Sequence, residues 1–257
     1  MKANQMGLDY NYKIEIAYDG SKYQGWQQLG GEHRKNTIQG ILADVLSDFC
    51  KESVNLIGAS RTDAKVHAKG QVANFHTNRK LQKEDILSFN QSLPPDIQVL
   101  SLKKVPKEFH SRYSALGKQY QYQIYCKDKP TPFLRHQCLF LEGELDISAM
   151  REASKVLIGK YDFAGFASQM NDKRSTVKTI TEIEITKQEN LIIITYEGEG
   201  FLYHMLRIIT GTLIEIGLHK RTLESLKEII RTGNRSLAGP TVEGKGLCLT
   251  KIYYKNI

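Results

Sequence analysis

The chain has 257 residues, of which 40% are apolar and 25% charged, proportions that are typical of a soluble globular protein. Lysine and arginine number 36 against 28 acidic residues, and this excess favours a polyanionic partner such as nucleic acid. The four cysteines form no CxxC pair, which argues against a disulfide framework. No run reaches the ~18 apolar residues that a membrane span requires, and the first residues contain no apolar leader, so we expect a cytoplasmic protein.

The first half of the chain combines strands and helices. Apolar and polar residues alternate over 12–18, which predicts a half-buried strand, and Asp19-Gly20 ends it as a turn. Thr37 precedes a helical stripe of apolar residues that runs to Phe49, so we predict that it caps a helix. The other predicted elements of this half are a strand at 71–76, a helix at 83–93 and a strand at 99–105.

After Pro106 the pattern starts again. Residues 119–126 alternate as a strand, and Asp146 or Ser148 is predicted to cap a helix that ends near Gly159. The remaining predictions are a hairpin of 179–186 with 191–197, helices at 201–217 and from Thr222 to Gly233, and a strand at 247–254. This order predicts an α+β fold of two similar α/β halves, 1–106 and 107–257, with largely antiparallel sheets flanked by helices.

Several familiar chemistries have no motif in this sequence. There is no GxxxxGK[ST] phosphate-binding loop, no HExxH pattern, no Cys/His cluster and no GxSxG elbow. The sequence therefore predicts neither a bound metal nor a cofactor.

One acidic residue lies alone in a basic segment. Asp63 is the only carboxylate between Glu52 and Glu84, and Arg61 precedes it by two residues. Nearby cations favour the charged form of a carboxylate, which makes Asp63 a candidate nucleophile or base. The alternative is a structural Arg61–Asp63 pair that holds a loop, and composition alone leaves both interpretations open.

The segment around Asp63 also carries a resemblance. RTDAKVHAKGQV (61–72) resembles the RTDxGVHAxGQV motif of the TruA-type tRNA pseudouridine synthases. Four more segments match that family in the same order: AYDGSKYQGWQ (17–27), FHSRYSALGKQYQYQIY (109–125), GFLYHMLRIITGTL (200–213) and AGPTVEGKGLCL (238–249). Five ordered motifs over more than 200 residues identify the chain as a member of that family, and imply the pseudouridine synthase fold.

The resemblance implies a role for four residues. Asp63 matches the catalytic aspartate, which acts at C1′ or C2′ of the target uridine while the base detaches, rotates and rejoins through C5. Arg61 matches the arginine that pairs with this aspartate and helps to hold the nucleotide out of the stack. Tyr120 matches the tyrosine that stacks on the flipped base, and Arg207 matches the arginine that anchors the carboxylate. No cofactor or metal is implied.

The same resemblance implies a substrate and an assembly. The family acts on uridines at positions 38 to 40 in the anticodon arm of tRNA, as a homodimer with one tRNA across both subunits. Lys65 and Lys69 are then expected to contact phosphates, and His67 to position the loop or to contact a phosphate. No membrane partner is expected.

This sequence departs from the family pattern at four places. Lys65 stands where the family has glycine, Ser60 precedes the motif arginine, Ile208 follows Arg207 in place of asparagine, and Val242-Glu243 replaces Ala-Pro. A glycine at 65 would allow a turn with positive φ, so lysine is expected to reshape the loop.

The four residues with implied roles are nevertheless all present, which favours an active tRNA pseudouridine synthase. The alternative is a catalytically impaired paralogue that binds tRNA or assists its folding.

Overall fold

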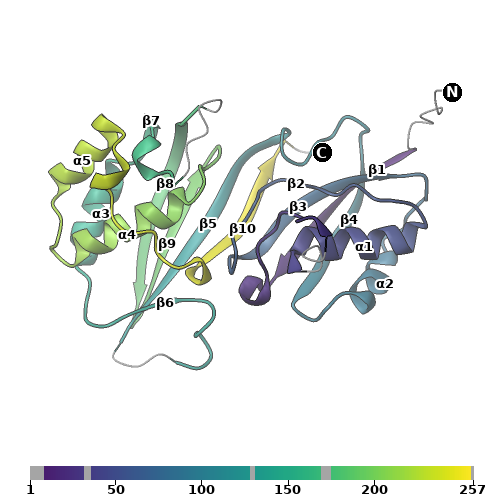
Figure 1. Ribbon diagram of the computed structural model, residues 1–257, viewed down its shortest axis with the longest axis horizontal. Coiled ribbons are helices and arrows are strands. Elements are labelled where there is room, and N and C mark those ends of the chain that lie inside the picture. Colours follow the sequence, from purple (N-terminus) through teal and green to yellow (C-terminus); the bar gives the residue numbers. More distant parts are fainter. Residues whose placement is uncertain (1–8, 32–35, 128–130, 169–174, 256–257) are drawn as a thin grey trace. The chain divides into compact units, whose positions relative to one another are not determined.

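The computed structural model describes residues 9–31, 36–127, 131–168 and 175–255 (Figure 1). The first residues, in which no leader is predicted, lie mostly outside this part. The chain divides into two compact units, one reaching Leu116 and including the end of the chain from Lys251, the other comprising Gly117–Thr250. Strand β10 (Leu247–Tyr254) therefore begins in the second unit and ends in the first.

The first unit contains an antiparallel sheet with β1 in the middle. Its strands are β1 (Tyr10–Tyr18), β2 (Ile57–Gly58), β3 (His67–Thr77) and β4 (Ile97–Val105). Ile14 of β1 faces Ala73 of β3 on one side and Leu102 of β4 on the other, and β2 pairs with β3. The strand predicted from the alternation at 12–18 is confirmed, and its alternate side chains are buried.

Two helices, α1 (Ile38–Cys50) and α2 (Asp85–Ser92), cover one face of this sheet (Figure 1). The predicted cap of α1 is confirmed, because Thr37 Oγ1 accepts a hydrogen bond from the backbone N–H of Gly40 at 3.3 Å. The rings of Phe49 and Phe89 meet edge to face with centroids 4.8 Å apart, which packs α1 against α2.

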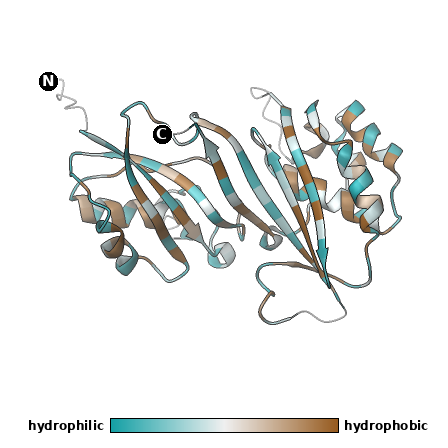
Figure 2. Cartoon of the chain, turned by 180° about the vertical axis from the view of Figure 1, so that it is seen from behind, coloured by the Kyte–Doolittle hydropathy of each residue, from teal (hydrophilic) through white to brown (hydrophobic). Residues whose placement is uncertain are grey.

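The second unit contains its own antiparallel strands, in the order β5-β9-β8-β7. They are β5 (Ala115–Cys126), β7 (Gly159–Asp162), β8 (Val177–Gln188) and β9 (Leu191–Gly198), with a short β6 (Leu139–Leu141) parallel to β5. The predicted hairpin is confirmed, since β8 and β9 pair until Gln188 faces Leu191. Figure 2 shows apolar and polar residues alternating along these strands.

Helices α3 (Ile147–Lys155), α4 (Met205–Gly217) and α5 (Leu223–Thr232) cover one face of the second unit's strands (Figure 1). Two predicted boundaries are wrong. Helix α3, capped by Asp146, ends at Lys155 rather than near Gly159, and α4 begins at Met205 rather than at 201. His204 has a left-handed backbone with φ 61°, which a continuous right-handed helix cannot include.

Short 3-10 helices complete the structure: η1 (Gly20–Lys22), η3 (Ala164–Phe166), η4 (Arg235–Leu237) and η5 (Gly244–Gly246). No helix in the described parts of the chain is both long enough and apolar enough to cross a membrane.

Candidate active site

The loop that carries Asp63 runs from the end of β2 to the start of β3, and β3 holds its first residues. The backbone N–H of Ala59 donates to the carbonyl of Val72 at 2.8 Å. The side chain of Gln71, which is fully buried, donates from Nε2 to the Ser60 carbonyl at 2.7 Å and accepts at Oε1 from the Ser60 N–H at 3.3 Å. The approach to Arg61 is therefore fixed by the sheet itself.

Thr62 anchors the middle of the loop. Its carbonyl accepts from the N–H of Trp26 at 3.0 Å, and its hydroxyl shares a hydrogen bond with Tyr18 at 2.7 Å. Thr62 is buried, whereas Arg61 is exposed and Asp63 is partly exposed. The buried side chain of Thr62 therefore fixes the backbone between the two charged residues. Arg61 and Asp63 on either side of it remain accessible to solvent.

Two glycines allow the N-terminal segment to lie directly against this loop. Gly25 has a φ of 102°, and a Cβ there would lie 2.5 Å from the carbonyl oxygen of Thr62. A Cβ at Gly20 would lie 2.0 Å from the carbonyl oxygen of Val66. Since real side chains do not approach a backbone oxygen so closely, both positions require glycine.

Lys65 adopts the conformation that glycine would favour. Its φ is 65°, its N–H donates to the carbonyl of Tyr23 at 3.2 Å, and the next residue, Val66, donates to the carbonyl of Asp63 at 3.2 Å. The lysine therefore keeps the positive-φ turn, contrary to the expectation that it would reshape the loop. Lys65 and Lys69 are both exposed.

His67 lies in the interior of the first unit, with only 7% of its surface exposed. Its Nδ1 accepts from the N–H of Gly20 at 3.1 Å and lies 3.2 Å from Oδ1 of Asp19. These contacts connect the start of β3 to the turn after β1, next to the close approach of Gly20 and Val66.

Tyr120 and Arg207 belong to the second unit. Tyr120 lies on β5, opposite Tyr196 of β9, and its buried ring meets Phe201 edge to face with centroids 5.6 Å apart. Arg207 lies in the first turn of α4, where its Nε donates to the carbonyl of Val242 at 2.7 Å.

The hydroxyl of Tyr122 lies in the same neighbourhood as Arg207. It donates to the carbonyl of Glu243 at 2.7 Å. Burial raises the pKa of this hydroxyl well above its ordinary value, while the charge of Arg207 acts in the opposite direction. Tyr122 is therefore a neutral donor that holds the segment after Val242.

The chain from Arg235 to Val242 is attached to α4 along its length. Thr212 Oγ1 accepts from the N–H of Gly239 at 2.9 Å and donates to the carbonyl of Ile208 at 2.8 Å. A Cβ at Gly211 would lie 2.0 Å from the carbonyl oxygen of Pro240, so the helix and the segment touch backbone to backbone there.

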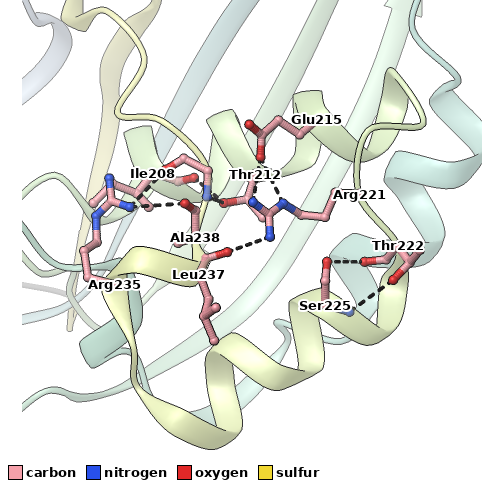
Figure 3. A network of polar contacts seen from close by, with 10 residues as sticks. Ile208, Thr212, Glu215, Arg221, Thr222, Ser225, Arg235, Leu237 and Ala238 are labelled. Atoms are coloured by element: carbon pink, nitrogen blue, oxygen red, sulfur yellow. Dashed lines mark hydrogen bonds and ion pairs between the residues drawn. The ribbon is translucent and has the colours of Figure 1, made fainter.

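Two arginines add hydrogen bonds that stabilise the segment from Arg235 to Val242 next to α4 (Figure 3). Arg221 donates to Glu215 Oε2 from Nε at 2.9 Å and to the carbonyl of Leu237 from Nη1 at 2.6 Å. Arg235 donates from Nη1 to the carbonyl of Gly239 at 3.0 Å. This network fixes the segment that supplies the hydrogen-bond acceptor of Arg207.

The structure also gives the environment of the remaining departures from the family pattern. Ile208 is fully buried, so an apolar side chain there adds to the core of the second unit. Glu243 is exposed, and its carboxylate pairs with Lys245 Nζ at 2.7 Å, which offsets the acidic charge that this chain carries in the segment.

The predicted site residues are thus divided between the two units. Arg61 and Asp63 share one loop of the first unit, and Tyr120 and Arg207 are placed in the second by β5 and α4. The quoted motifs contain the residues that hold them, namely Tyr18, Gly25, Gln71 and Val242, but motif matching did not predict this supporting role. The glycines and aromatic residues of the 17–27 segment were the available signal. No cluster of metal-ligating side chains occurs in the described residues.

The chain is similar in sequence to known tRNA pseudouridine synthases. A family model described as tRNA pseudouridine synthase matches residues 15–114 and 153–255. A Clostridium tetani protein named tRNA pseudouridine synthase A 2 is 41% identical over 245 residues, covering 95% of this chain and 98% of the relative. The tRNA pseudouridine synthase A of Clostridium kluyveri is 40% identical, with 95% and 99% covered.

Proposed function

The chain belongs to the tRNA pseudouridine synthase family, and we propose that Asp63 is the catalytic residue with which it isomerises uridine in tRNA. In this reaction the bond between N1 of uracil and C1′ of ribose breaks, and a bond between C5 and C1′ forms. The hydrogen on C5 leaves as a proton and N1 regains one, so the atoms balance without a redox partner. Asp63 adds to C1′ or removes a C2′ proton, and both routes use an ionised carboxylate.

The observation that carries this proposal is the anchoring of the Asp63 loop. Thr62, immediately before Asp63, is held through its carbonyl by Trp26 and through its hydroxyl by Tyr18. A group that must meet one ribose atom benefits from such a fixed backbone, because misplacement by about 1 Å can cost 10²-fold in rate.

The other motif residues have supporting roles in the proposed reaction. Extracting a base from its stack costs roughly a few kcal/mol, and the ring of Tyr120 and the guanidinium of Arg61 offset part of that cost. Arg207 is oriented by its hydrogen bond to the carbonyl of Val242. Lys65 and Lys69 contact phosphates, and His67 contacts a phosphate or positions the loop through Gly20.

The proposed targets are uridines at positions 38 to 40 in the anticodon arm, and the proposed assembly is a cytoplasmic homodimer. The chain mass is 29.3 kDa, so sedimentation equilibrium should give twice that value for the free protein. A mass of one chain at the concentrations used for catalysis would contradict the assembly.

The reaction is tested by tritium release from tRNA transcripts that carry uridine labelled at C5. Wild type is expected to release tritium, and Asp63→Asn is expected to release none while binding tRNA with near wild-type affinity. Asp48→Asn, an exposed carboxylate on α1, is the matched control and should behave as wild type. Transcripts without uridine at positions 38 to 40 should release nothing.

Unchanged release by Asp63→Asn would exclude Asp63 as the catalyst. Tight tRNA binding by a wild-type protein that releases no tritium from any transcript would favour the second candidate, a tRNA-binding or folding protein. The retained positive-φ turn at Lys65 supports the catalytic candidate.

A further inference from the structure

A rigid turn between β4 and β5 lies outside the Asp63 loop. Its centre, Ser111, is fully buried and is held by three different parts of the first unit. The Ser111 N–H donates to Oδ1 of Asn74 at 2.8 Å, and its hydroxyl donates to the carbonyl of Ile57 at 2.5 Å. The hydroxyl of Tyr254 donates to the Ser111 carbonyl at 2.6 Å.

The flanks of this turn are equally well held. The carbonyl of Phe109 accepts from Nδ2 of Asn11 at 2.9 Å and from Nδ2 of Asn74 at 3.3 Å. The N–H of Ser114 donates to the carbonyl of His110 at 2.9 Å. This segment is therefore hydrogen-bonded to β1, β2, β3 and β10. Because the backbone is fixed, the side chains that point to solvent have fixed starting positions.

The turn presents the side chain of Tyr113 to solvent, with 81% of its surface exposed. The centroid of its ring lies 4.3 Å from the centroid of the His110 imidazole, and the two ring planes form an angle of 34°. Arg112 beside it is exposed, and within the described parts of the chain its guanidinium makes no hydrogen bond or ion pair. Lys107 and Glu108 are the other charged residues of the segment, and both are exposed.

We propose that Tyr113 and Arg112 form a second RNA-contact site, in which the tyrosine ring stacks on an unpaired base and the guanidinium binds the adjoining phosphate. An unpaired nucleotide offers both a π-face and an anion, and proteins bind single-stranded RNA by pairing aromatic stacking with cationic contacts. Large aromatic side chains are normally buried, and a rigid turn that exposes one next to an arginine without a partner matches this ligand.

The turn and the Asp63 loop are both anchored to strand β3 of the first unit. Asn74 holds the turn, and Gln71 of the same strand holds Ser60 at the start of the loop. Three residues of a strand span about 10 Å along its axis, so the backbone anchors of the turn and of the loop lie on neighbouring positions of one strand. The inference rests on the proposed function in taking tRNA as the ligand, but it uses no catalytic residue.

Binding of full-length tRNA to Tyr113→Ala, Tyr113→Phe and Arg112→Ala tests the site, with Kd measured over a range of salt concentrations. Tyr113→Ala should raise Kd about tenfold, because a lost stack typically costs that much, and Tyr113→Phe should retain affinity. Arg112→Ala should reduce the slope of log Kd against log salt by about one phosphate contact. Tritium release under single-turnover conditions at saturating tRNA should be unchanged in all three.

Two matched controls use exposed residues that lack this setting. Leu87→Ala removes an apolar side chain on α2 that is 67% exposed, and Arg231→Ala removes an exposed arginine that pairs with Glu228. Both should bind tRNA as wild type, and urea unfolding of every variant verifies the fold.

Wild-type affinity of Tyr113→Ala at every salt concentration would overturn the proposal, even if wild type releases tritium. A Tyr113→Ala protein that loses affinity only because its dimer dissociates would also overturn it, since the ring would then be a subunit contact. If wild type releases no tritium but binds tRNA in a Tyr113-dependent manner, the catalytic proposal fails and this site stands.

Discussion

Lys65 is the residue at which this chain departs most visibly from the family motif, yet its backbone has a φ of 65°. A side chain in the left-handed region costs roughly 1–2 kcal/mol. The conformation persists because two backbone hydrogen bonds hold the chain on either side of the Lys65 Cα. The Lys65 N–H donates to the carbonyl of Tyr23, and the Val66 N–H donates to the carbonyl of Asp63. Lysine therefore adds a positive charge next to Asp63 without altering the turn.

Lys65→Gly removes both the backbone strain and the positive charge at this position. Two measurements, of stability and of tRNA binding, report on these two effects separately. The free energy of unfolding should stay unchanged or rise by up to about 1 kcal/mol, because relief of strain is partly offset by greater freedom of the unfolded chain. The Kd for tRNA should increase, and its salt dependence should fall by about one phosphate contact. Denaturant titration and binding at several salt concentrations measure the two effects.

Lys51→Gly is the matched control, since Lys51 has a φ of 58° at the end of α1. It should show the same change in stability and no change in tRNA binding. Equal binding by Lys65→Gly and wild type at all salt concentrations would remove Lys65 from the phosphate contacts.

Glu52 provides a pH-dependent contribution to stability. Its carboxylate accepts from the Thr77 hydroxyl and, at 2.7 Å, from the N–H of Asn78, and these hydrogen bonds lower its pKa, that of Thr77 most strongly. A lowered pKa means that the contribution is present above the unfolded-state value of about 4.3 and is lost as the pH falls through the folded-state value. Glu52→Gln should therefore be less stable than wild type at pH 7, and the two urea midpoints should converge on acidification. A constant difference from pH 7 to pH 3 would contradict this account.

At the scale of elements, helix α4 and the segment from Arg235 to Val242 pack closely together and are joined by hydrogen bonds. The helix supplies Arg207, and the segment supplies the Val242 carbonyl that accepts from it at 2.7 Å. Contact at Gly211, where a Cβ would lie 2.0 Å from the Pro240 carbonyl, sets the separation between the two.

Gly211→Ala should disturb this separation. In an open helix the change would stabilise by about 1 kcal/mol, but here overpacking should dominate and destabilise by about 1–3 kcal/mol. The displaced Val242 carbonyl should also weaken the orientation of Arg207 and lower the single-turnover rate at saturating tRNA.

Gly200→Ala is the matched control, because nothing lies within 4 Å of a Cβ at that position, and it should keep the wild-type melting temperature and rate. A Gly211→Ala protein as stable and active as wild type would show that the segment moves freely on α4.

At the scale of the whole molecule, the four cysteines are all free and buried. Burial raises the pKa of the Cys138 thiol to about 11, and burial likewise raises the pKa of Cys50 and Cys126. Each unit therefore depends on its apolar core rather than on covalent links.

Thiol titration at pH 8 should accordingly find no reactive cysteine in the native protein and all four in denaturant. A raised pKa leaves little of the reactive thiolate at that pH, and burial excludes the reagent. Rapid reaction of any native thiol, measured with an aromatic disulfide reagent, would contradict the structure.

The order of residues along the chain was enough to predict the main elements and the family. Alternation identified β1 and β5, the Thr37 cap identified the start of α1, and five ordered motifs pointed to the tRNA pseudouridine synthases. These features depend on neighbouring residues or on short patterns, which a single chain displays directly. The roles of Asp63 and the other motif residues stay predictions, because they concern chemistry with RNA.

Apart from the predicted hairpin of β8 and β9, the strand pairing and the contacts that hold the site residues follow from the three-dimensional fold and could not be predicted from the sequence. The order β5-β9-β8-β7, the position of Gly25 under Thr62, and the acceptor of Arg207 on Val242 all join residues far apart in the chain. The helical pattern that starts at 201 includes a left-handed His204, so α4 begins at Met205. Pairing and backbone strain of this kind arise from contacts distant in sequence, and these override local propensity.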